Sequence, residues 1–208
     1  MKRLLTSLLC TALLAACSNS EDVNPKAVKP AETSPSAAAA AELRPENIAY
    51  YHEKVDSQKI RLALKKAGFD QGRKKEAEWN QRLEVAKTDA DLKSVLNEQL
   101  DFYRRGQQAL AKIEMNSEQG RTIRRHLLNG FAGTVPILEA VQPVDLTSAE
   151  GEVIMNEAMP KIHQYGQEIG LGLKLWMDML KASDQPLDAD AEKAFQEKMK
   201  EVEAKLKE

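Results

Sequence analysis

The stretch from Thr147 to Leu180 reads TSAEGEVIMNEAMPKIHQYGQEIGLGLKLWMDML and has the most regular apolar spacing in the chain. Large apolar side chains recur every three or four residues, which is the spacing of one face of an α-helix. Thr147 to Glu150 has the form of a capping box, so we expect the helix to begin there. Pro160 lacks a backbone N–H and is expected to bend or divide it. The apolar stripe consists of Ile154, Ala158, Ile162, Tyr165, Ile169, Leu173, Trp176 and Leu180.

Three glycines, Gly166, Gly170 and Gly172, lie inside this expected helix. A glycine costs about 1 kcal/mol relative to alanine in a helix interior. The glycines therefore predict that another backbone approaches closely, either a neighbouring helix or a partner. We prefer a contact within the fold.

Helical spacing continues on both sides of this stretch, from residue 42 to the end of the chain, and we find no alternating run that is typical of a β-strand. Caps and stops divide it into segments, with Pro136 expected to kink or restart one of them. The sequence therefore predicts an all-α fold, an antiparallel bundle of five or six helices over residues 42–208. The expected boundaries are a start at Pro45 and a stop at Gly68, a short helix through Trp79 and Leu83, starts at Thr88 and Ser117, an end at Gln142, and a last helix from Ala191 to Leu206.

The first residues, MKRLLTSLLCTALLAACSNS, have the order of an export signal. Lys2 and Arg3 precede an apolar run that is too short to cross a bilayer core of about 30 Å as a helix. Leu14-Ala15-Ala16-Cys17 then resembles the lipobox of bacterial lipoproteins. The resemblance implies that residues 1–16 are removed and that Cys17 carries acyl chains that hold the protein to a membrane. The alternative is an ordinary secreted protein with a free Cys17.

Residues 17–41 contain the cysteine followed by a segment rich in proline, alanine and small polar residues. Such a segment has too little apolar surface to offset the entropy of ordering, so we expect a disordered tether. At its length a flexible chain holds the domain about 25 to 30 Å from the membrane. Ser18 directly follows the cysteine, and the resemblance to lipoproteins with an uncharged residue there implies transport to the outer membrane.

The charge is nearly balanced, with 30 Lys and Arg against 32 Asp and Glu, which gives a net charge of -2. We therefore expect no nucleic-acid partner. Cations nevertheless gather in residues 54–75, whereas acids dominate residues 139–208. Neighbouring helices of opposite charge would account for this pattern; alternatively, a basic face meets lipid head groups, lipopolysaccharide or an acidic protein. The candidate partner-binding residues are Lys65, Lys66, Arg73, Lys74, Lys75, Arg121, Arg124 and Arg125.

Met155, Met159 and His163 are spaced at i, i+4 and i+8, and thioethers with an imidazole are ligands that suit copper(I). They are candidate metal ligands on an unbroken helix. The competing interpretation is that the methionines fill gaps in the core, since methionine often has that role.

The sequence contains no motif that predicts catalysis. A Gly-x-Ser-x-Gly elbow is missing, and Cys10 would leave with the signal, so that Cys17 is the only remaining cysteine. We therefore expect no enzyme and no cofactor. The expected function is that of a membrane-anchored lipoprotein of the cell envelope that binds another envelope protein or component. In architecture it resembles pilot lipoproteins, which escort secretin subunits to the outer membrane. The alternative is a periplasmic helical protein that binds a small ligand or copper.

Overall fold

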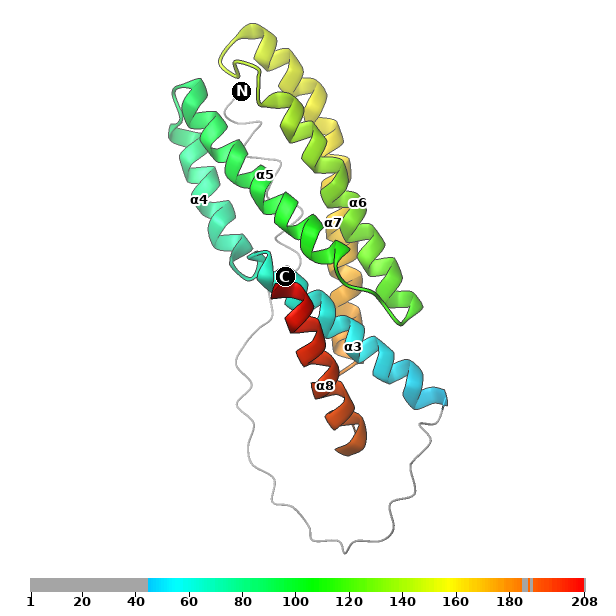
Figure 1. The fold of residues 1–208 in the computed structure, drawn as a ribbon. Helices are drawn as coiled ribbons and strands as arrows, with labels where there is room; N and C mark the ends of the chain where they lie inside the picture. Colours follow the sequence, from blue (N-terminus) through cyan, green and yellow to red (C-terminus); the bar gives the residue numbers. More distant parts are fainter. Residues whose placement is uncertain (1–44, 185–186, 188, 208) are drawn as a thin grey trace, which may run out of the picture.

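The computed structural model describes residues 45–184, 187 and 189–207, and these residues form helices joined by short turns with no β-strand among them (Figure 1). The predicted signal at residues 1–16, Cys17 and the predicted tether at residues 17–41 lie outside this part of the chain. The prediction of an all-α fold is confirmed. The elements are α3 (Pro45–Lys66), the 3-10 turn η1 (Phe69–Gln71), α4 (Gly72–Val85), α5 (Asp89–Ala111), α6 (Glu118–Val141), α7 (Ala149–Ala182) and α8 (Ala189–Lys207).

The two longest helices, α6 and α7, lie antiparallel along most of their length (Figure 1). Helix α5 packs against α6, and α4 packs against α5. Helix α3 crosses α5, α6 and α7, and α8 packs against another side of α3. None of the described helices combines the length and the hydropathy that a membrane span requires.

The apolar core forms where α5 and α6 meet the turn after α3. Gly68 adopts a positive φ of 87°, which ends α3 as expected, and the chain then turns Phe69 inward. The Phe69 ring stacks on Phe102 with centroids 4.1 Å apart and lies 5.1 Å from the Phe131 ring. Phe102 and Phe131 are fully buried. The stop signal at Gly68 therefore also positions a core aromatic residue.

Several predicted helix starts are confirmed by their caps. The Thr88 side chain accepts a hydrogen bond from the Asp91 backbone N–H at 3.2 Å, and the Asp91 carboxylate accepts one from the Thr88 N–H at 3.0 Å. The Asp91 carboxylate also accepts a hydrogen bond from the Lys87 N–H. This bond, followed by the hydrogen bonds with Thr88, lowers the pKa of Asp91. Ser117 caps α6 through the Gly120 N–H. Pro45 begins α3, and the predicted seam of α8 is buried from Ala191 to Leu206.

The predicted cap of α7 is wrong by one residue. Ser148, not Thr147, accepts the hydrogen bond from the first turn, at 3.0 Å from the Gly151 nitrogen. The Thr147 hydroxyl instead donates to the Asp145 carboxylate at 2.6 Å, and the Thr147 N–H donates to the same oxygen at 2.9 Å. Because this local turn occupies Thr147, the helix starts one residue later.

Neither proline divides its helix, so the predicted restart at Pro136 and the predicted division at Pro160 are wrong. The kink at Pro136 and the bend at Pro160 stay predictions. Pro136 lies inside α6 and Pro160 inside α7, and both helices run on past them. Each proline is exposed, and so are Ala132 and Asn156, the residues whose carbonyls lose their helical donor. Since these carbonyls lie on the outer face, water can take the place of the missing N–H.

Glycines allow α6 and α7 to approach closely. A β-carbon at Gly130 would lie 2.3 Å from Ile169 Cγ1, and one at Gly172 would lie 2.8 Å from Leu127 Cγ. The expected close approach is therefore confirmed at Gly172. Apart from its own helix backbone, no atom of the described residues lies within 4 Å of a β-carbon built at Gly170, so packing among these residues does not explain that glycine.

We predict that Gly130→Ala lowers the free energy of unfolding by about 1–3 kcal/mol, because the added methyl overlaps a buried side chain and the Tyr165 carbonyl oxygen, 2.8 Å away. Gly170→Ala is the matched control in the neighbouring helix, and should raise stability by about 0.5–1 kcal/mol because its site is open. Urea denaturation measures both. Equal changes in the two variants would contradict close packing at Gly130.

Candidate functional site

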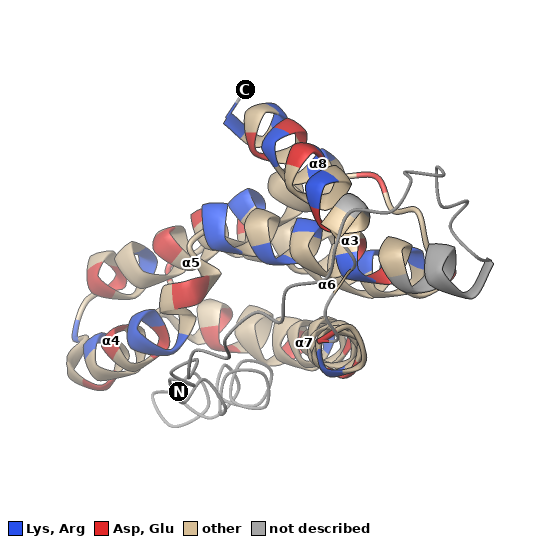
Figure 2. Ribbon diagram, turned by 90° about the horizontal axis from the view of Figure 1, so that it is seen from below, with Lys and Arg blue, Asp and Glu red and all other residues tan. Residues whose placement is uncertain are grey.

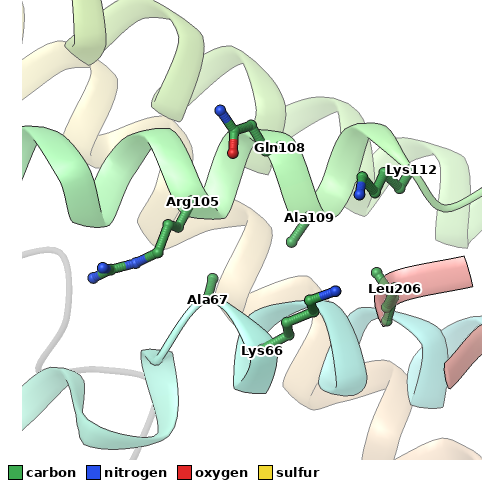
Figure 3. A pocket seen from close by; sticks show the side chains of 7 residues that line it. All are labelled: Lys66, Ala67, Arg105, Gln108, Ala109, Lys112 and Leu206. Carbon is green, nitrogen blue, oxygen red and sulfur yellow. The ribbon is translucent and has the colours of Figure 1, made fainter. Parts of the chain in front are cut away.

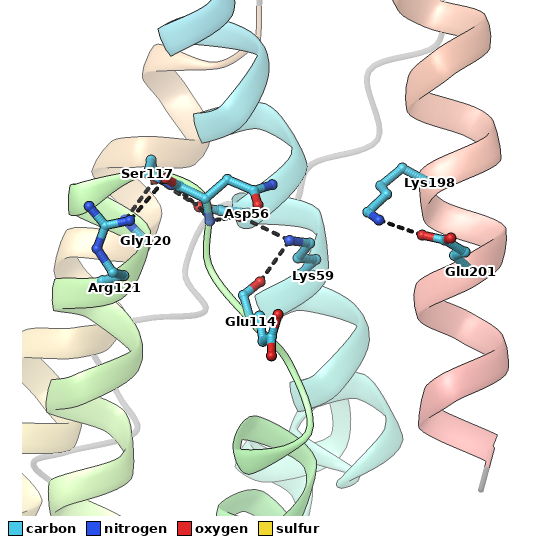
Figure 4. Close-up of polar contacts among 9 residues, drawn as sticks. Asp56, Lys59, Glu114, Ser117, Gly120, Arg121, Lys198 and Glu201 are labelled. Atoms are coloured by element: carbon cyan, nitrogen blue, oxygen red, sulfur yellow. Dashed lines mark hydrogen bonds and ion pairs between the residues drawn. The ribbon is translucent and has the colours of Figure 1, made fainter.

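A buried carboxylate holds the turn between α5 and α6. Asp56, on α3, is fully buried and accepts backbone N–H bonds from Asn116 at 2.8 Å and from Ser117 at 2.7 Å. It also accepts a hydrogen bond from the Ser117 hydroxyl at 2.8 Å (Figure 4). Ser117 caps α6, so the negative charge lies beside a helix N-terminus, where it is favourable. One side chain thus ties α3 to the start of α6.

Lys59 completes this buried network. Its ammonium nitrogen lies 3.3 Å from Asp56 Oδ1 and donates to the Glu114 carbonyl oxygen at 2.7 Å. Lys59 is only 4 % exposed, so the ammonium compensates the carboxylate charge where water is excluded. Gly120 leaves room for the carboxylate, because a β-carbon there would lie 2.5 Å from Asp56 Oδ2.

Two adjoining hollows lie between α8 and the C-terminal end of α5, with volumes of about 130 Å³ and 140 Å³. Lys112 lines both, and we call them together the basic groove. The first hollow is lined by Lys66, Ala67, Arg105, Gln108, Ala109, Lys112 and Leu206 (Figure 3). The second is lined by Lys59, Lys112, Ile113, Glu114, Asn116, Lys198, Glu201, Val202 and Lys205.

The first hollow has a positive rim. Within the described part of the chain, no carboxylate oxygen lies within 4.0 Å of the charged nitrogen atoms of Lys66, Arg105 or Lys112. Beside these cations lie three buried apolar side chains, Ala67, Ala109 and Leu206. Figure 2 shows Lys and Arg gathered where α3, α5 and α8 lie beside one another. This hollow therefore offers unneutralised positive charge next to apolar surface.

The second hollow is more nearly neutral. Lys198 forms an ion pair with Glu201 on the side of α8 that faces α3 (Figure 4). The hydrogen bond from Lys198, and then its charge, lower the pKa of Glu201, so this carboxylate stays ionised and offsets the lysine. Lys59 is already bonded to Asp56 and Glu114. Lys205 also lines this hollow, and its charge adds to that of Lys198 in lowering the pKa of Glu201.

Helix ends explain why cations occur here. Lys66 is the last residue of α3, Lys112 follows the last residue of α5, and Lys205 lies in the last turn of α8. Cations are favourable at a helix C-terminus because it carries partial negative charge. That local effect accounts for each lysine separately. The packing of α3 against both α5 and α8 is what brings all of them around one groove.

The structure places the sequence-predicted basic residues in separate regions. Lys65 and Lys66 end α3, and only Lys66 of the predicted set lines the basic groove. The α4 cations lie on its first turns, where Lys74 is exposed and 4.0 Å from Glu78. The remaining predicted residues of the set are Arg73 and Lys75 on α4 and Arg121, Arg124 and Arg125 on α6.

Two of the α6 arginines hold backbone carbonyls. Arg124 donates to the Leu110 oxygen at 2.8 Å and to the Ala111 oxygen at 3.1 Å, which satisfies the C-terminal end of α5. Arg121 donates to the Asn116 oxygen at 3.0 Å. Both side chains therefore stabilise the α5–α6 turn that forms one wall of the basic groove.

We predict that Arg124→Ala lowers the free energy of unfolding by about 0.5–1.5 kcal/mol, because two helix-end carbonyls lose their donor. Arg125→Ala is the adjacent control; this side chain is exposed, so the change should stay within about 0.5 kcal/mol. Thermal unfolding of both variants measures the difference. Similar losses in the two variants would exclude the capping role.

The candidate metal ligands do not share one face. Met155 and Met159 are buried in the core of α7, at 5 % and 8 % exposure. His163 is exposed, and its Nε2 lies 3.0 Å from the Gln167 side-chain nitrogen. This placement favours the packing interpretation of the methionines. The described residues also include no group of three or more His, Cys, Asp or Glu side chains that could hold a metal ion.

In comparisons with known proteins, no family model, curated protein or solved structure matches the chain. The functional argument therefore depends on the residues of the basic groove. Sequence reasoning missed Arg105, Lys112 and Lys205. Each is an ordinary exposed cation in its own helix or at its end, and only the position of α3 brings them together.

Proposed function

We propose that this protein is a membrane-anchored binding protein of the bacterial cell envelope, which holds an anionic region of another envelope component in the basic groove. The observation that carries the proposal is the convergence of Lys66, Arg105 and Lys112 on one hollow without neutralising carboxylates nearby in the described structure. Charged rims of this kind attract and orient an oppositely charged partner.

The lipobox resemblance supports the anchored part of the proposal. Acyl chains on Cys17 would hold the protein at a membrane, since two or three chains make attachment effectively permanent. A flexible tether then keeps the helical domain within a few tens of ångströms of that surface. A partner in the same envelope layer is present at high effective concentration, so the groove needs only modest intrinsic affinity. With Ser18 after the cysteine, the outer membrane is the proposed location, as for the pilot lipoproteins.

The copper-binding alternative has less support. Met159 packs in the core of α7, and His163 lies on its exposed side. A shared copper site would need the methionine to leave that core, at a cost comparable to removing a buried side chain, about 2–5 kcal/mol. The proposed binding role requires no such rearrangement.

We predict that a photo-crosslinking residue at Gln108 captures a discrete partner in cells, because this exposed side chain lines the groove. The full chain is expressed in a bacterium with an outer membrane, irradiated and analysed by mass. The same preparation should contain a chain that begins at Cys17 and carries acyl groups.

Gln164 provides the matched position, since it is an exposed glutamine on α7 outside the groove. Cys17→Ser should leave the chain without acyl groups. Equal adducts from both glutamines would contradict binding in the groove. A released chain with an unmodified Cys17 would contradict the anchor.

A further inference from the structure

We infer that the occupant of the basic groove is an acidic amphipathic helix of a partner protein. This inference rests on the proposed binding function and specifies its ligand. Three properties of the groove carry it: its length, its apolar floor, and the kind of polar group that its walls present.

The unneutralised cations are spread along the groove. Arg105 and Lys112 are seven residues apart on α5, which corresponds to about 10 Å along a helix axis. Lys205 continues the rim into the second hollow. A small anion in the first hollow meets the cations of that hollow but not Lys205 in the second. A helix lying beside α5 with carboxylates two turns apart meets both ends of the rim together.

The floor of the groove is apolar along the same direction. Ala109 and Leu206 face the first hollow, and Ile113 and Val202 face the second. All four belong to the core and are less than 9 % exposed, so only a narrow strip of apolar surface reaches the groove between the cations. A partner with carboxylates on one edge and small apolar side chains on its face would cover that strip, as in other helix-in-groove interactions.

The walls favour carboxylates over a compact phosphate. Phosphate sites often use free backbone N–H groups at a helix N-terminus. Here α3, α5 and α8 contribute their C-terminal ends, which present carbonyl oxygens instead. The Asn116 N–H beside the second hollow is already bonded to Asp56. The donors that remain for an anion are side-chain groups, namely the cations of the rim and the Gln108 amide.

The test measures peptide binding to the full acylated chain in neutral phosphatidylcholine vesicles, with protein-free vesicles as a blank. The probe is a fluorescent peptide of about twenty residues with glutamates on one helical edge and alanine and leucine on the adjoining face. Fluorescence anisotropy should show binding that weakens with salt. Arg105→Glu with Lys112→Glu should weaken it at least about tenfold, since two rim charges are reversed.

Lys161→Glu with Lys174→Glu is the matched control, because it changes the net charge equally at exposed positions of α7. This control should alter the affinity by no more than about twofold. A peptide with glutamine in place of every glutamate should not bind. Glycerol phosphate, as a lipid head group, should displace the acidic peptide no better than chloride at equal ionic strength.

Four results would overturn the inference: equal weakening in the groove variant and the α7 control, equal binding of the glutamine peptide, no binding of the acidic peptide, or displacement by glycerol phosphate. The last would assign the groove to phosphorylated head groups. If Cys17 is acylated and the adduct at Gln108 is specific, but the peptide does not bind, this inference is wrong while the anchored binding role still holds. An unmodified Cys17 would contradict only the proposed membrane anchor.

Discussion

The position of α3 depends on the carboxylate of Asp56. This side chain is buried and supplies the acceptor for two backbone N–H groups of the α5–α6 turn, while Lys59 balances its charge. Removing one partner from such a network leaves a buried charge or polar group unpaired, which is far more costly than losing an exposed ion pair. Helix α8 packs on α3, so the same interaction also determines where α8 lies. The basic groove exists because α3 and α8 are held beside the end of α5.

Most of the fold could be predicted from local signals. Gly68, Thr88 and Ser117 act within a few residues of their own position, so their effects on helix ends are visible in the sequence. The wrong cap and the wrong division predicted for α7 have local causes too. Thr147 is occupied by Asp145, and Pro160 lies on the exposed face, where water can replace the lost hydrogen bond. Periodicity predicted the helix correctly, but it could not specify these competing contacts.

The candidate site could not be predicted in the same way. Its cations come from three helices far apart in the sequence. The charge density of residues 54–75 pointed to Lys66 but not to Arg105, Lys112 or Lys205. Lys59 and Arg124, both basic residues near the groove, are bonded to backbone carbonyls, so charge alone does not separate structural cations from free ones. Likewise, the sequence does not distinguish Gly120 from any other glycine in a helix, because its role depends on the Asp56 carboxylate that packs beside it in the structure. Tertiary packing decides which charges remain available.

Amide hydrogen exchange at Asn116 and Ser117 tests the role of Asp56 most directly, because both N–H groups donate to its carboxylate. The account predicts that these two turn amides exchange as slowly as amides in the middle of α5 and α6, opening only when the fold opens. Exchange at the rate of an exposed loop would mean that the carboxylate does not hold the turn, and would contradict the account of how α3 and the basic groove are positioned.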